Sequence, residues 1–515
     1  MKLLPVLPVL IPLLTAALAL LQWRHRVAQR RLSVAGAIAL FVAAVWLFAV
    51  VQREGVQVVQ SGGWQAPFGI SFVADTFSSL MVLFAATTNL CVVIYSLTSI
   101  DARREAFGYH LLLHVMLMGV CGAFLTGDIF NLYVWFELML MASFVLLALG
   151  GERRQMEGAI KYVTINLVSS ALFLAAVGLL YAATGTLNMA DLALKAQHVN
   201  PAGMRTVIAL LFFVAFGVKA ALFPLYFWLP ASYHTPPVVI SAIFAGLLTK
   251  VGVYSLARVF TLIFRNDAGY MQPLLLWVAA LTMIAGGLGA IVQRDLRRML
   301  SFLIISHIGV AAMGLGIFTE RAFAGMIFYL IEDIVVLTNL FLIAGGVRLL
   351  CGTYDLTQTG GIYRRHPSFG FLFLIPALSL SGIPPFSGFF AKLALIQAGL
   401  EAGRYAVVGV SLAVSLLTLY AMARVWMLAF WREQPATTPT NLAAPLATLA
   451  APLTTPIPTI SPRRARRALI PIAALSALTI ALGLGAEFVF RQSLIAAGVL
   501  AEPRLYVEAV LGGER

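Results

Sequence analysis

The sequence predicts an all-α integral membrane protein with about fourteen transmembrane helices. Of the 515 residues, 61% are hydrophobic and only 11% are charged, a balance that water-soluble domains do not have. The chain also divides into apolar stretches, most of which reach the roughly 20 residues needed to cross the hydrocarbon core of a bilayer. Both observations indicate one integral membrane domain.

The expected spans are separated by more polar segments, of which the longest covers residues 432–467. In chain order they cover residues 3–21, 33–52, 70–98, 109–126, 128–150, 161–184, 205–229, 237–262, 272–292, 302–318, 322–350, 368–400, 405–431 and 468–490. Only Lys2 precedes the first span, and no small-residue cleavage site follows Leu21. We therefore interpret the first span as a retained helix and not as a signal peptide.

The positive charge is concentrated in alternate loops. The net charge is +14, and the basic loops carry Arg24, Arg26, Arg30, Arg31, Arg103, Arg104, Arg153, Arg154, Lys161, Arg294, Arg297, Arg298, Arg364, Arg365, Arg463, Arg464, Arg466 and Arg467. By the positive-inside rule these loops face the cytoplasm and both termini lie on the opposite side. The excess of basic residues thus indicates how the helices are oriented in the membrane, and no nucleic-acid partner is expected.

The residues that build redox or nucleotide sites lack the necessary spacing. The cysteines Cys91, Cys121 and Cys351 stand singly, which argues against iron–sulfur and structural zinc sites. No glycine-rich phosphate loop occurs between a strand and a helix. We expect no cofactor and no metal site, so electron transfer or nucleotide chemistry would have to occur elsewhere.

Two spans are interrupted by proline. Pro224 follows Lys219 by five residues, and Pro384-Pro385 precedes Lys392. Proline removes a backbone donor, and the freed backbone groups are tolerated in a membrane only where protein or water satisfies them. Broken helices in corresponding halves of a chain point to inverted repeats. These breaks, about five spans apart, divide the chain into residues 1–108, a first unit 109–262, a second unit 272–431, a linker 432–467 and a last segment 468–515.

The linker differs in composition from the rest of the chain. It is rich in Pro, Thr and Ala and ends in a run of arginines. We interpret it as a flexible cytoplasmic segment that ends in a basic membrane anchor, and as an inert insertion.

Lysine is rare here, yet half of the lysines lie inside apolar spans. Six lysines stand against 29 arginines, and Lys219, Lys250 and Lys392 are flanked by apolar helix sequence. A charge at the centre of a membrane helix costs roughly 2.5–3.5 kcal/mol on insertion scales. A buried lysine, unlike arginine, can lose its proton near neutral pH. The three residues therefore suggest a path for protons. For Lys250 the alternative is a snorkelling side chain, which extends along the helix to place its ammonium group at the membrane surface.

Further ionisable residues occur within or beside the spans. Glu137 is expected to partner Lys219, as a protonation switch or as a static ion pair. His307 is either a proton relay or a hydrogen-bonded core histidine. The adjacent Glu332 and Asp333 diverge by about 100° on a helix, so they are not expected to face one narrow channel together. The loop residue His234 is a candidate for proton entry. Asp75 and Asp128 are interpreted as caps or interfacial groups.

Several motifs together resemble the antiporter-like membrane subunits shared by multisubunit cation/proton antiporters and respiratory complex I. FNLYVWFEL contains Glu137, FGVKAALFPLYFWLPASYHTPPVVISAIFAGLLTKVGVY contains Lys219 and Lys250, and LSLSGIPPFSGFFAKL contains Lys392. The sequence around WLPASY, LLTKVGVY and TNLFLIAGG is most similar to D-type subunits of Mrp sodium/proton antiporters. The resemblance covers most of the chain.

This resemblance implies fourteen helices, two inverted five-helix units (helices 4–8 and 9–13) and breaks in helices 7 and 12. It also implies a hydrophilic axis of Glu, Lys and His along which protons pass. The expected setting is a hetero-oligomeric complex of a bacterial plasma membrane that exchanges Na⁺ for protons. Two alternatives remain open. The chain is a proton-pumping subunit of a complex I-like oxidoreductase or membrane hydrogenase, or it is a scaffold that does not conduct.

One segment departs from the family pattern. In related D-type subunits the stretch FYLIEDIVVLTNLFLIAGG is expected to carry a histidine at Glu332 and a lysine at Leu337. An apolar residue thus stands where the resemblance implies the central lysine of the second unit. The predicted path is consequently interrupted between Lys250 and Lys392, with Glu332 and His307 as candidates to bridge the gap through water.

Overall fold

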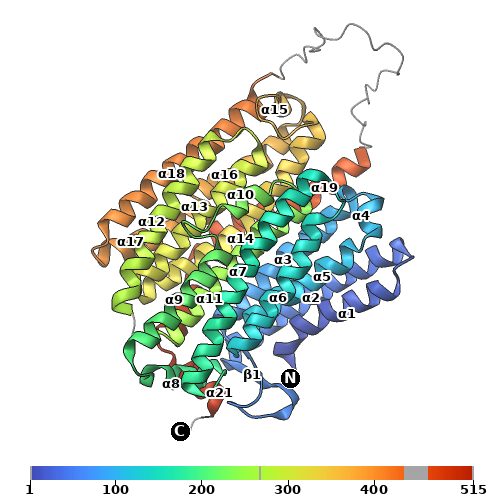
Figure 1. Cartoon of the computed structure of the whole chain (residues 1–515). Coiled ribbons are helices and arrows are strands. Elements are labelled where there is room, and N and C mark those ends of the chain that lie inside the picture. Colours follow the sequence, from blue (N-terminus) through green and yellow to red (C-terminus); the bar gives the residue numbers. More distant parts are fainter. Residues whose placement is uncertain (1–2, 266–267, 434–461, 513–515) are drawn as a thin grey trace.

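The computed structural model describes residues 3–265, 268–433 and 462–512. It is a bundle of long helices packed side by side, with both termini at one end and α15 (Ile362–Arg365) at the other (Figure 1). Within this part of the chain, twelve helices are long and apolar enough to cross a membrane, and Tyr109–Leu125 and Pro367–Ser381 are shorter apolar helices. The expected all-α membrane fold is confirmed.

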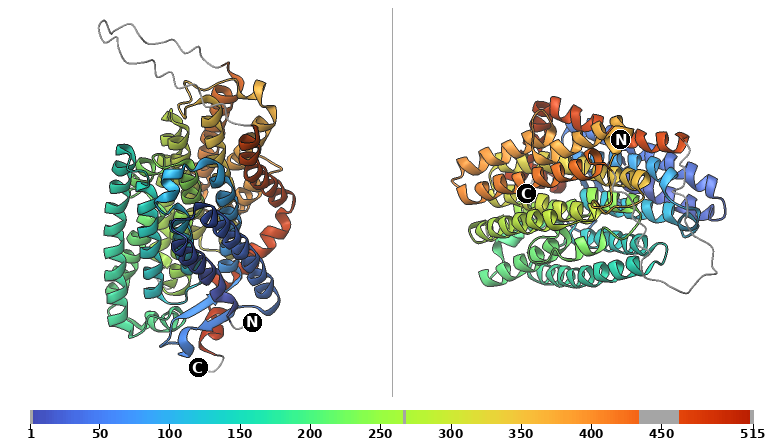
Figure 2. Two further views of the ribbon diagram at one scale, coloured as in Figure 1. Left: turned by 90° about the vertical axis from the view of Figure 1, so that its right-hand side faces the viewer. Right: turned by 90° about the horizontal axis from the view of Figure 1, so that it is seen from above.

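The N-terminal fifth of the chain contains three membrane-spanning helices and a small hairpin. Strands β1 (Gln57–Gln60) and β2 (Ser71–Ala74) pair antiparallel, with Gln57 opposite Ala74. The helices of this part are α1 (Leu7–Leu21), α2 (Arg26–Glu54), α3 (Thr76–Ser99) and the short α4 (Ala102–Ala106). Figure 2 (left) shows the hairpin beside the two termini at the same end of the bundle.

The next helices carry the first of the two proline breaks. They are α5 (Tyr109–Leu125), α6 (Ile129–Ala148), α7 (Arg153–Thr184), α8 (Met189–Lys195), α9 (Ala202–Ala220), α10 (Trp228–Ser232) and α11 (Val238–Leu262). Helix α9 ends in a left-handed residue, Ala221 (φ 62°), and Pro224 lies in the irregular segment before α10. Lys219 therefore occupies the last turn of a helix that stops inside the apolar region.

The following helices repeat this design. They are α12 (Ala268–Val292), α13 (Leu296–Ile317), α14 (Glu320–Cys351), α15, α16 (Pro367–Ser381), α17 (Ser387–Glu401) and α18 (Tyr405–Val425), which continues as a π-helix over Trp426–Trp431. Pro384 and Pro385 lie between α16 and α17. Lys392 follows on α17, in the second turn after the break.

The chain closes with α19 (Pro462–Leu484), α20 (Ala486–Ala501) and α21 (Arg504–Leu511). Residues 434–461 of the expected linker lie outside the described residues. Helix α19 begins at Pro462 and includes the basic run that we expected at the end of the linker. The helix contains Pro471 and is continuous from the basic run into the apolar stretch.

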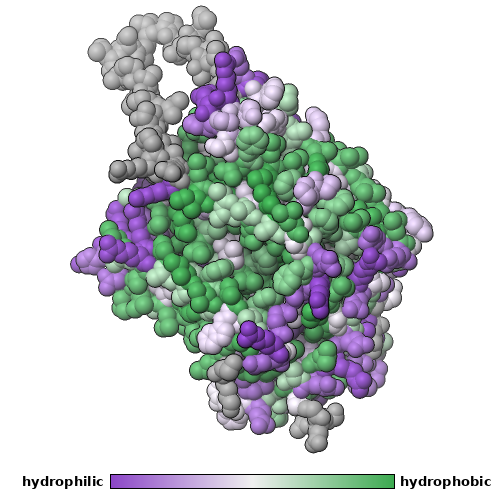
Figure 3. All heavy atoms as spheres, turned by 180° about the vertical axis from the view of Figure 1, so that it is seen from behind, coloured by the Kyte–Doolittle hydropathy of each residue, from purple (hydrophilic) through white to green (hydrophobic). Residues whose placement is uncertain are grey.

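Burial ranks the helices from the centre outward. The apolar windows of α11, α13 and α14 are 100%, 94% and 78% buried, whereas those of α7 and of the α18 helix are 39% buried. Figure 3 shows a broad apolar surface on one face, with hydrophilic residues gathered toward its edges. The three central helices carry Lys250, His307, Glu332 and Asp333, so these groups lie where the protein excludes lipid.

Candidate functional site

The three membrane-embedded lysines are all buried. Helices α9, α11 and α17 place them in the interior, where Lys219 and Lys392 are 6% exposed and Lys250 is 0% exposed. A snorkelling lysine would keep its ammonium group in water, and the full burial of Lys250 excludes that alternative for it.

Lys250 forms a buried ion pair with Asp333 at the centre of the protein. Its Nζ lies 2.8 Å from Asp333 Oδ2 and also donates to the carbonyl of Ala245 at 2.6 Å. This contact joins α11 to α14. Because the cost of burying either charge alone is several kcal/mol, the pair holds the two helices together and keeps an ionisable cluster inside the membrane.

His307 extends this cluster to α13. Its Nδ1 lies 3.0 Å from Asp333 Oδ1 and 2.7 Å from the hydroxyl of Tyr329, whose ring stacks on the imidazole at 5.5 Å. The other ring nitrogen, Nε2, is buried without a hydrogen-bond partner among the described residues. His307 is thus a hydrogen-bonded core histidine at Nδ1, whereas Nε2 has no partner in the described part of the chain.

Glu332 continues the polar chain toward the second helix break. Ser379, on α16, donates to Glu332 Oε1 at 3.0 Å, and its hydroxyl lies 3.1 Å from that of Ser387 at the start of α17. The backbone N–H of Gly388 also donates to Ser379 Oγ at 3.1 Å. The break at Pro384-Pro385 therefore brings two hydroxyl groups and a backbone donor next to a buried carboxylate.

The two adjacent carboxylates contact different helices: Asp333 faces α11 and α13, whereas Glu332 faces α16. Oxygen atoms of Glu332 and Asp333 and a ring nitrogen of His307 all lie within 4.8 Å of one another. Among the residues that the structure describes, these three are also the group that has the composition and spacing to hold a cation.

Lys392 approaches this group without pairing with it. Its Nζ donates to the carbonyl of Leu380 at 2.9 Å, one of the carbonyls left free where α16 ends. Gly382 (φ 80°) accommodates the lysine, since a Cβ there would lie 2.9 Å from Lys392 Cδ. The broken helix thus supplies both the acceptor and the space for the ammonium group.

Lys219 has different neighbours from those expected. Its Nζ donates to Ser170 Oγ on α7 at 3.1 Å and lies 4.9 Å from the centre of the Phe136 ring. No ion pair between Lys219 and Glu137 occurs among the described residues, and Glu137 Oε1 is buried without a hydrogen-bond partner there. The expected direct pair is therefore absent, because the Phe136 ring, one residue before Glu137 on α6, faces the ammonium group instead.

A small cavity lies beside Lys219. Its volume is about 10 Å³, and it is lined by polar groups of Tyr162 and Asn166 together with Lys219 and apolar side chains. A water molecule needs roughly 10–15 Å³ of such volume and two or more polar partners. The site is therefore large enough for one water molecule next to the lysine.

His234 lies at the rim of a much larger cavity. It contacts the Pro230 carbonyl through Nδ1 at 2.8 Å, and the cavity has a volume of about 690 Å³. Arg104, Glu152, Asp295, Arg297 and Arg348 also line it. Burial lowers the pKa of His234, with Asp295 opposing the shift and Arg297 adding to it. This cavity opens at the end of the bundle that carries the basic loops.

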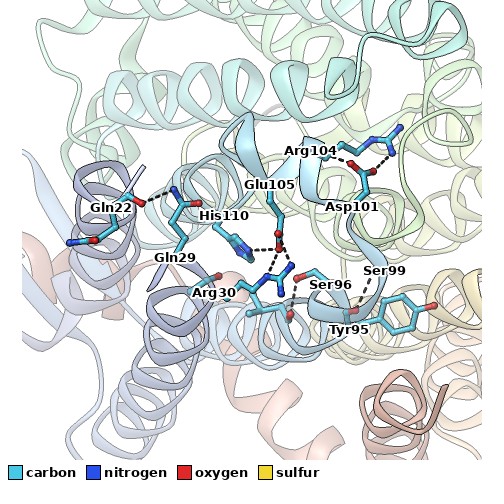
Figure 4. A network of polar contacts seen from close by, with 12 residues as sticks. Gln22, Gln29, Arg30, Tyr95, Ser96, Ser99, Asp101, Arg104, Glu105 and His110 are labelled. Atoms are coloured by element: carbon cyan, nitrogen blue, oxygen red, sulfur yellow. Dashed lines mark hydrogen bonds and ion pairs between the residues drawn. The ribbon is translucent and has the colours of Figure 1, made fainter. Parts of the chain in front are cut away.

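A second buried polar network lies near the same end, away from the central axis (Figure 4). Arg30 of α2 makes two 2.7 Å contacts with Glu105 of α4, and His110 of α5 lies 3.4 Å from the same carboxylate. Burial alone would raise the pKa of Glu105, but the hydrogen bonds from His110 and Arg30 outweigh it and hold that pKa at about 2. This network fastens the N-terminal helices to α5.

Sequence reasoning missed three contributors to the site, namely Ser170, Tyr329 and Ser379. Tyr329 had a detectable signal, because it precedes Asp333 by four residues and so shares its helix face. Ser170 and Ser379 had none, since serine is common in membrane helices and often bonds back to its own helix. Leu337, four residues after Asp333, is fully buried and apolar.

Known proteins share both the sequence and the fold of this chain. Residues 126–418 match the transmembrane family described as NADH:quinone oxidoreductase/Mrp antiporter. The D-type subunit of the Na(+)/H(+) antiporter of Alkalihalophilus pseudofirmus is 43% identical over 507 residues, which cover 98% of this chain and 99% of that protein.

Solved structures agree with these relatives. A chain of the Mrp complex from Dietzia sp. is 32% identical with a TM-score of 0.87, and the match covers 99% of this chain and 100% of that chain. A chain of respiratory complex I from Thermus thermophilus is 26% identical with a TM-score of 0.79 over the same shares of both chains. The protein is a multi-pass membrane protein that belongs to the NADH:quinone oxidoreductase/Mrp antiporter transmembrane family.

Proposed function

We propose that this chain is the D-type, proton-translocating subunit of a multisubunit Na⁺/H⁺ antiporter. The buried cluster of Lys250, Asp333 and His307 carries the proposal, because it gathers three ionisable groups where lipid and bulk water are excluded. Ionisable residues inside a membrane are expensive and mark ion pathways. A static scaffold needs no such group.

The proposed route follows the polar groups across the protein. Protons enter beside His234, reach the axis, and pass along Glu137, Lys219, Lys250, Asp333, His307, Glu332 and Lys392. Helices α9 and α11 approach closely at Gly252, where an added Cβ would lie 2.9 Å from the Lys219 carbonyl carbon. The backbone of Lys219 therefore lies beside the turn of α11 that carries Lys250. Water beside Lys219 and the hydroxyls of Ser379 and Ser387 would link the remaining steps.

The direction of the route follows from the charge distribution. Arg364 and Arg365 lie on α15, at the end of the bundle opposite both termini (Figure 1), and Arg104, Arg297 and Arg348 line the large cavity. This distribution favours a cytoplasmic position for the α15 end and an extracytoplasmic position for the termini in a bacterial plasma membrane. We further propose that residues 109–262 and 272–431 are inverted units, because each contains one helix that stops beside a buried lysine.

The relatives favour this function over a role in a redox-linked complex. The curated protein that is 43% identical is named an antiporter subunit, whereas the complex I chain is 26% identical. The buried ion pair of Lys250 and Asp333 beside His307 disfavours the scaffold alternative. Other antiporter subunits are the expected partners, with protons and Na⁺ as the transported ions.

The test replaces single members of the route in the assembled complex. Lys219→Ala and Glu137→Ala are each expected to abolish Na⁺-dependent proton movement in inverted membrane vesicles, measured with a pH-sensitive dye. Lys195→Ala and Glu157→Ala are matched controls, since both residues form ion pairs on the surface and their loss is expected to leave transport intact. Normal transport by both test variants would contradict the proposed proton relay.

A further inference from the structure

Two charged side chains lie on the outward face of α20. Glu487 and Arg491 are both exposed and lie about one helical turn apart. Neither makes an ion pair or a side-chain hydrogen bond among the residues that the structure describes. The membrane-embedded lysines Lys219, Lys250 and Lys392 are, by contrast, buried. The described part of the chain thus provides no partner for either charge of α20.

Close packing contacts show at which depth α20 lies. An added Cβ at Gly483 would lie 2.4 Å from the carbonyl oxygen of Pro385, so α20 begins beside the break between α16 and α17. That break separates two helices of 15 residues each, which places it near the middle of the membrane. At the other end of α20, an added Cβ at Gly498 would lie 3.7 Å from Oε1 of Glu320, the first residue of α14. Helix α20 therefore runs from the middle of the membrane to one of its surfaces.

Both charges fall inside the hydrocarbon core at this depth. Glu487 follows Gly483 by about 6 Å along the helix axis and Arg491 follows it by about 12 Å, at a rise of roughly 1.5 Å per residue. Half of the hydrocarbon core is about 15 Å thick. A charged side chain inside the membrane is costly and almost always faces protein or a water-filled cavity. The outward position of these two residues therefore calls for a polar partner outside the chain.

The helix alone does not account for both residues. Glu487 lies in the first turn of α20, where the free backbone N–H groups favour a carboxylate, but Arg491 lies beyond that turn and gains nothing from it. Side chains on a helix lean toward its N-terminus, so Arg491 leans toward the middle of the membrane and away from the nearer headgroups. A pair between Arg491 and Glu487 would still leave some of the five guanidinium N–H donors without partners in lipid.

The residues around the two charges have the pattern of a helix–helix contact. Leu484, which ends α19, and Phe488 and Ile495 of α20 are 76%, 62% and 45% exposed. Together with Arg491 they follow one another at spacings of four, three and four residues, which is the spacing of the contact seam in paired helices. Lipid tails can cover the apolar members of this stripe but offer no partner to the charges. A neighbouring protein helix can do both.

We propose that Leu484, Glu487, Phe488, Arg491 and Ile495 form a docking surface, the α20 surface, for a transmembrane helix of another subunit of the complex. Charge complementarity defines that helix: it carries a cationic side chain level with Glu487 and a carboxylate level with Arg491. A second copy of this chain does not fit, because it has the same orientation in the membrane and would set like charges at the same depth. This inference goes beyond the proposed transport and does not depend on the proton route.

The first test exchanges the two charges without changing their number. The double variant Glu487→Arg, Arg491→Glu keeps the composition and net charge of α20 but reverses the order of its charges. When the complex is purified through an affinity tag on this chain, the variant is expected to retain at least tenfold less of one other subunit, measured by quantitative mass spectrometry. The matched control, Glu502→Arg with Arg504→Glu, exchanges two exposed charges beyond the end of α20 and is expected to retain every subunit. Full retention by the test variant would overturn the docking surface.

The second test leaves both charges in place, so it also decides the case in which the exchanged variant does not fold. Phe488 is replaced by the photoreactive p-benzoylphenylalanine, and the purified complex is irradiated. A cross-link to a different subunit, identified by mass spectrometry of its peptides, is expected. Cross-linking to lipid alone, or to a second copy of this chain, contradicts the proposal.

Both tests measure assembly and not transport. Their failure leaves the proton relay standing, whereas normal transport by Lys219→Ala overturns the relay and leaves the α20 surface untouched.

Discussion

At the residue scale, the least expected feature is a buried arginine at the end of the bundle near the termini. Arg258 on α11 lies 2.6 Å from Asp75 Oδ2 and donates to the hydroxyl of Tyr254 at 3.1 Å. Its guanidinium also lies 5.2 Å from the ring centre of Tyr506, on α21, and 5.7 Å from that of Phe77. One cation thus joins α3, α11 and the C-terminal helix.

Removing one partner of this pair is expected to be costly. Asp75→Asn leaves the guanidinium buried without its carboxylate, and breaking a buried pair in this way costs about 3–5 kcal/mol. The variant should lower the temperature at which the purified complex unfolds. The measurement is the loss of soluble complex in detergent as the sample is heated. The double variant Asp75→Asn, Arg258→Met should be less destabilised than Asp75→Asn alone. Equal stability of the unmodified complex, the single variant and the double variant would contradict a structural role for the pair.

At the element scale, glycine determines how closely the broken helices approach their neighbours. An added Cβ at Gly252 on α11 would lie 2.6 Å from the Ala220 backbone nitrogen, and one at Gly388 on α17 would overlap the Ser379 carbonyl oxygen. Backbone atoms cannot move aside as a flexible side chain can. Both close contacts occur where a helix stops, so the glycines hold the breaks, and the lysines beside them, in position.

Gly252→Ala tests this arrangement. The methyl group would push the end of α9 away from α11, at an overpacking cost of about 1–3 kcal/mol, and would displace Lys219. Sodium-dependent proton movement should fall at least tenfold while the complex still assembles. The matched control is Gly178→Ala on α7, where a Cβ meets nothing within 4 Å; its transport should be normal. Equal transport by the two variants would show that this contact does not position Lys219.

At the scale of the whole molecule, ionisable residues lie along the long central helices, and apolar residues cover the outer surface of the bundle. Helices α11, α13 and α14 are almost fully buried, so a hydrophilic axis can run through the bundle without meeting lipid. Helix α15, which carries Arg364 and Arg365, lies at one end, and the hairpin and both termini lie at the other (Figure 1). This polarity is the basis for the proposed orientation.

Site-directed labelling checks that orientation. In a chain whose buried cysteines Cys91, Cys121 and Cys351 are replaced by alanine, Ser61→Cys should react with a membrane-impermeant maleimide on intact cells. Arg103→Cys, exposed near the opposite end, should react only after permeabilisation. Labelling is read by mass shift on a gel. Reaction of Arg103→Cys on intact cells, with no reaction of Ser61→Cys, would reverse the proposed topology.

Much of the molecule was determined by local sequence. Long apolar runs can only form helices that satisfy their own backbone hydrogen bonds in lipid, and Asp75 and Asp128 cap α3 and α6 as their positions before apolar runs indicated. The isolated lysines and the prolines beside them marked the interior and the interrupted helices. These features depend on residues within one or two turns of each other, which the order of the chain specifies directly.

The partners of the ionisable groups were decided only by tertiary structure. Lys250 pairs with Asp333, 83 positions later in the chain, Lys219 faces Ser170 and Phe136 and not Glu137, and Glu332 meets Asp333 beside His307. Each contact depends on which faces of separate helices meet. Helix packing sets that choice through the summed fit of many apolar side chains, and no single motif encodes it. The sequence determined which ionisable groups are buried, and the packing determined which of them form ion pairs and hydrogen bonds with one another.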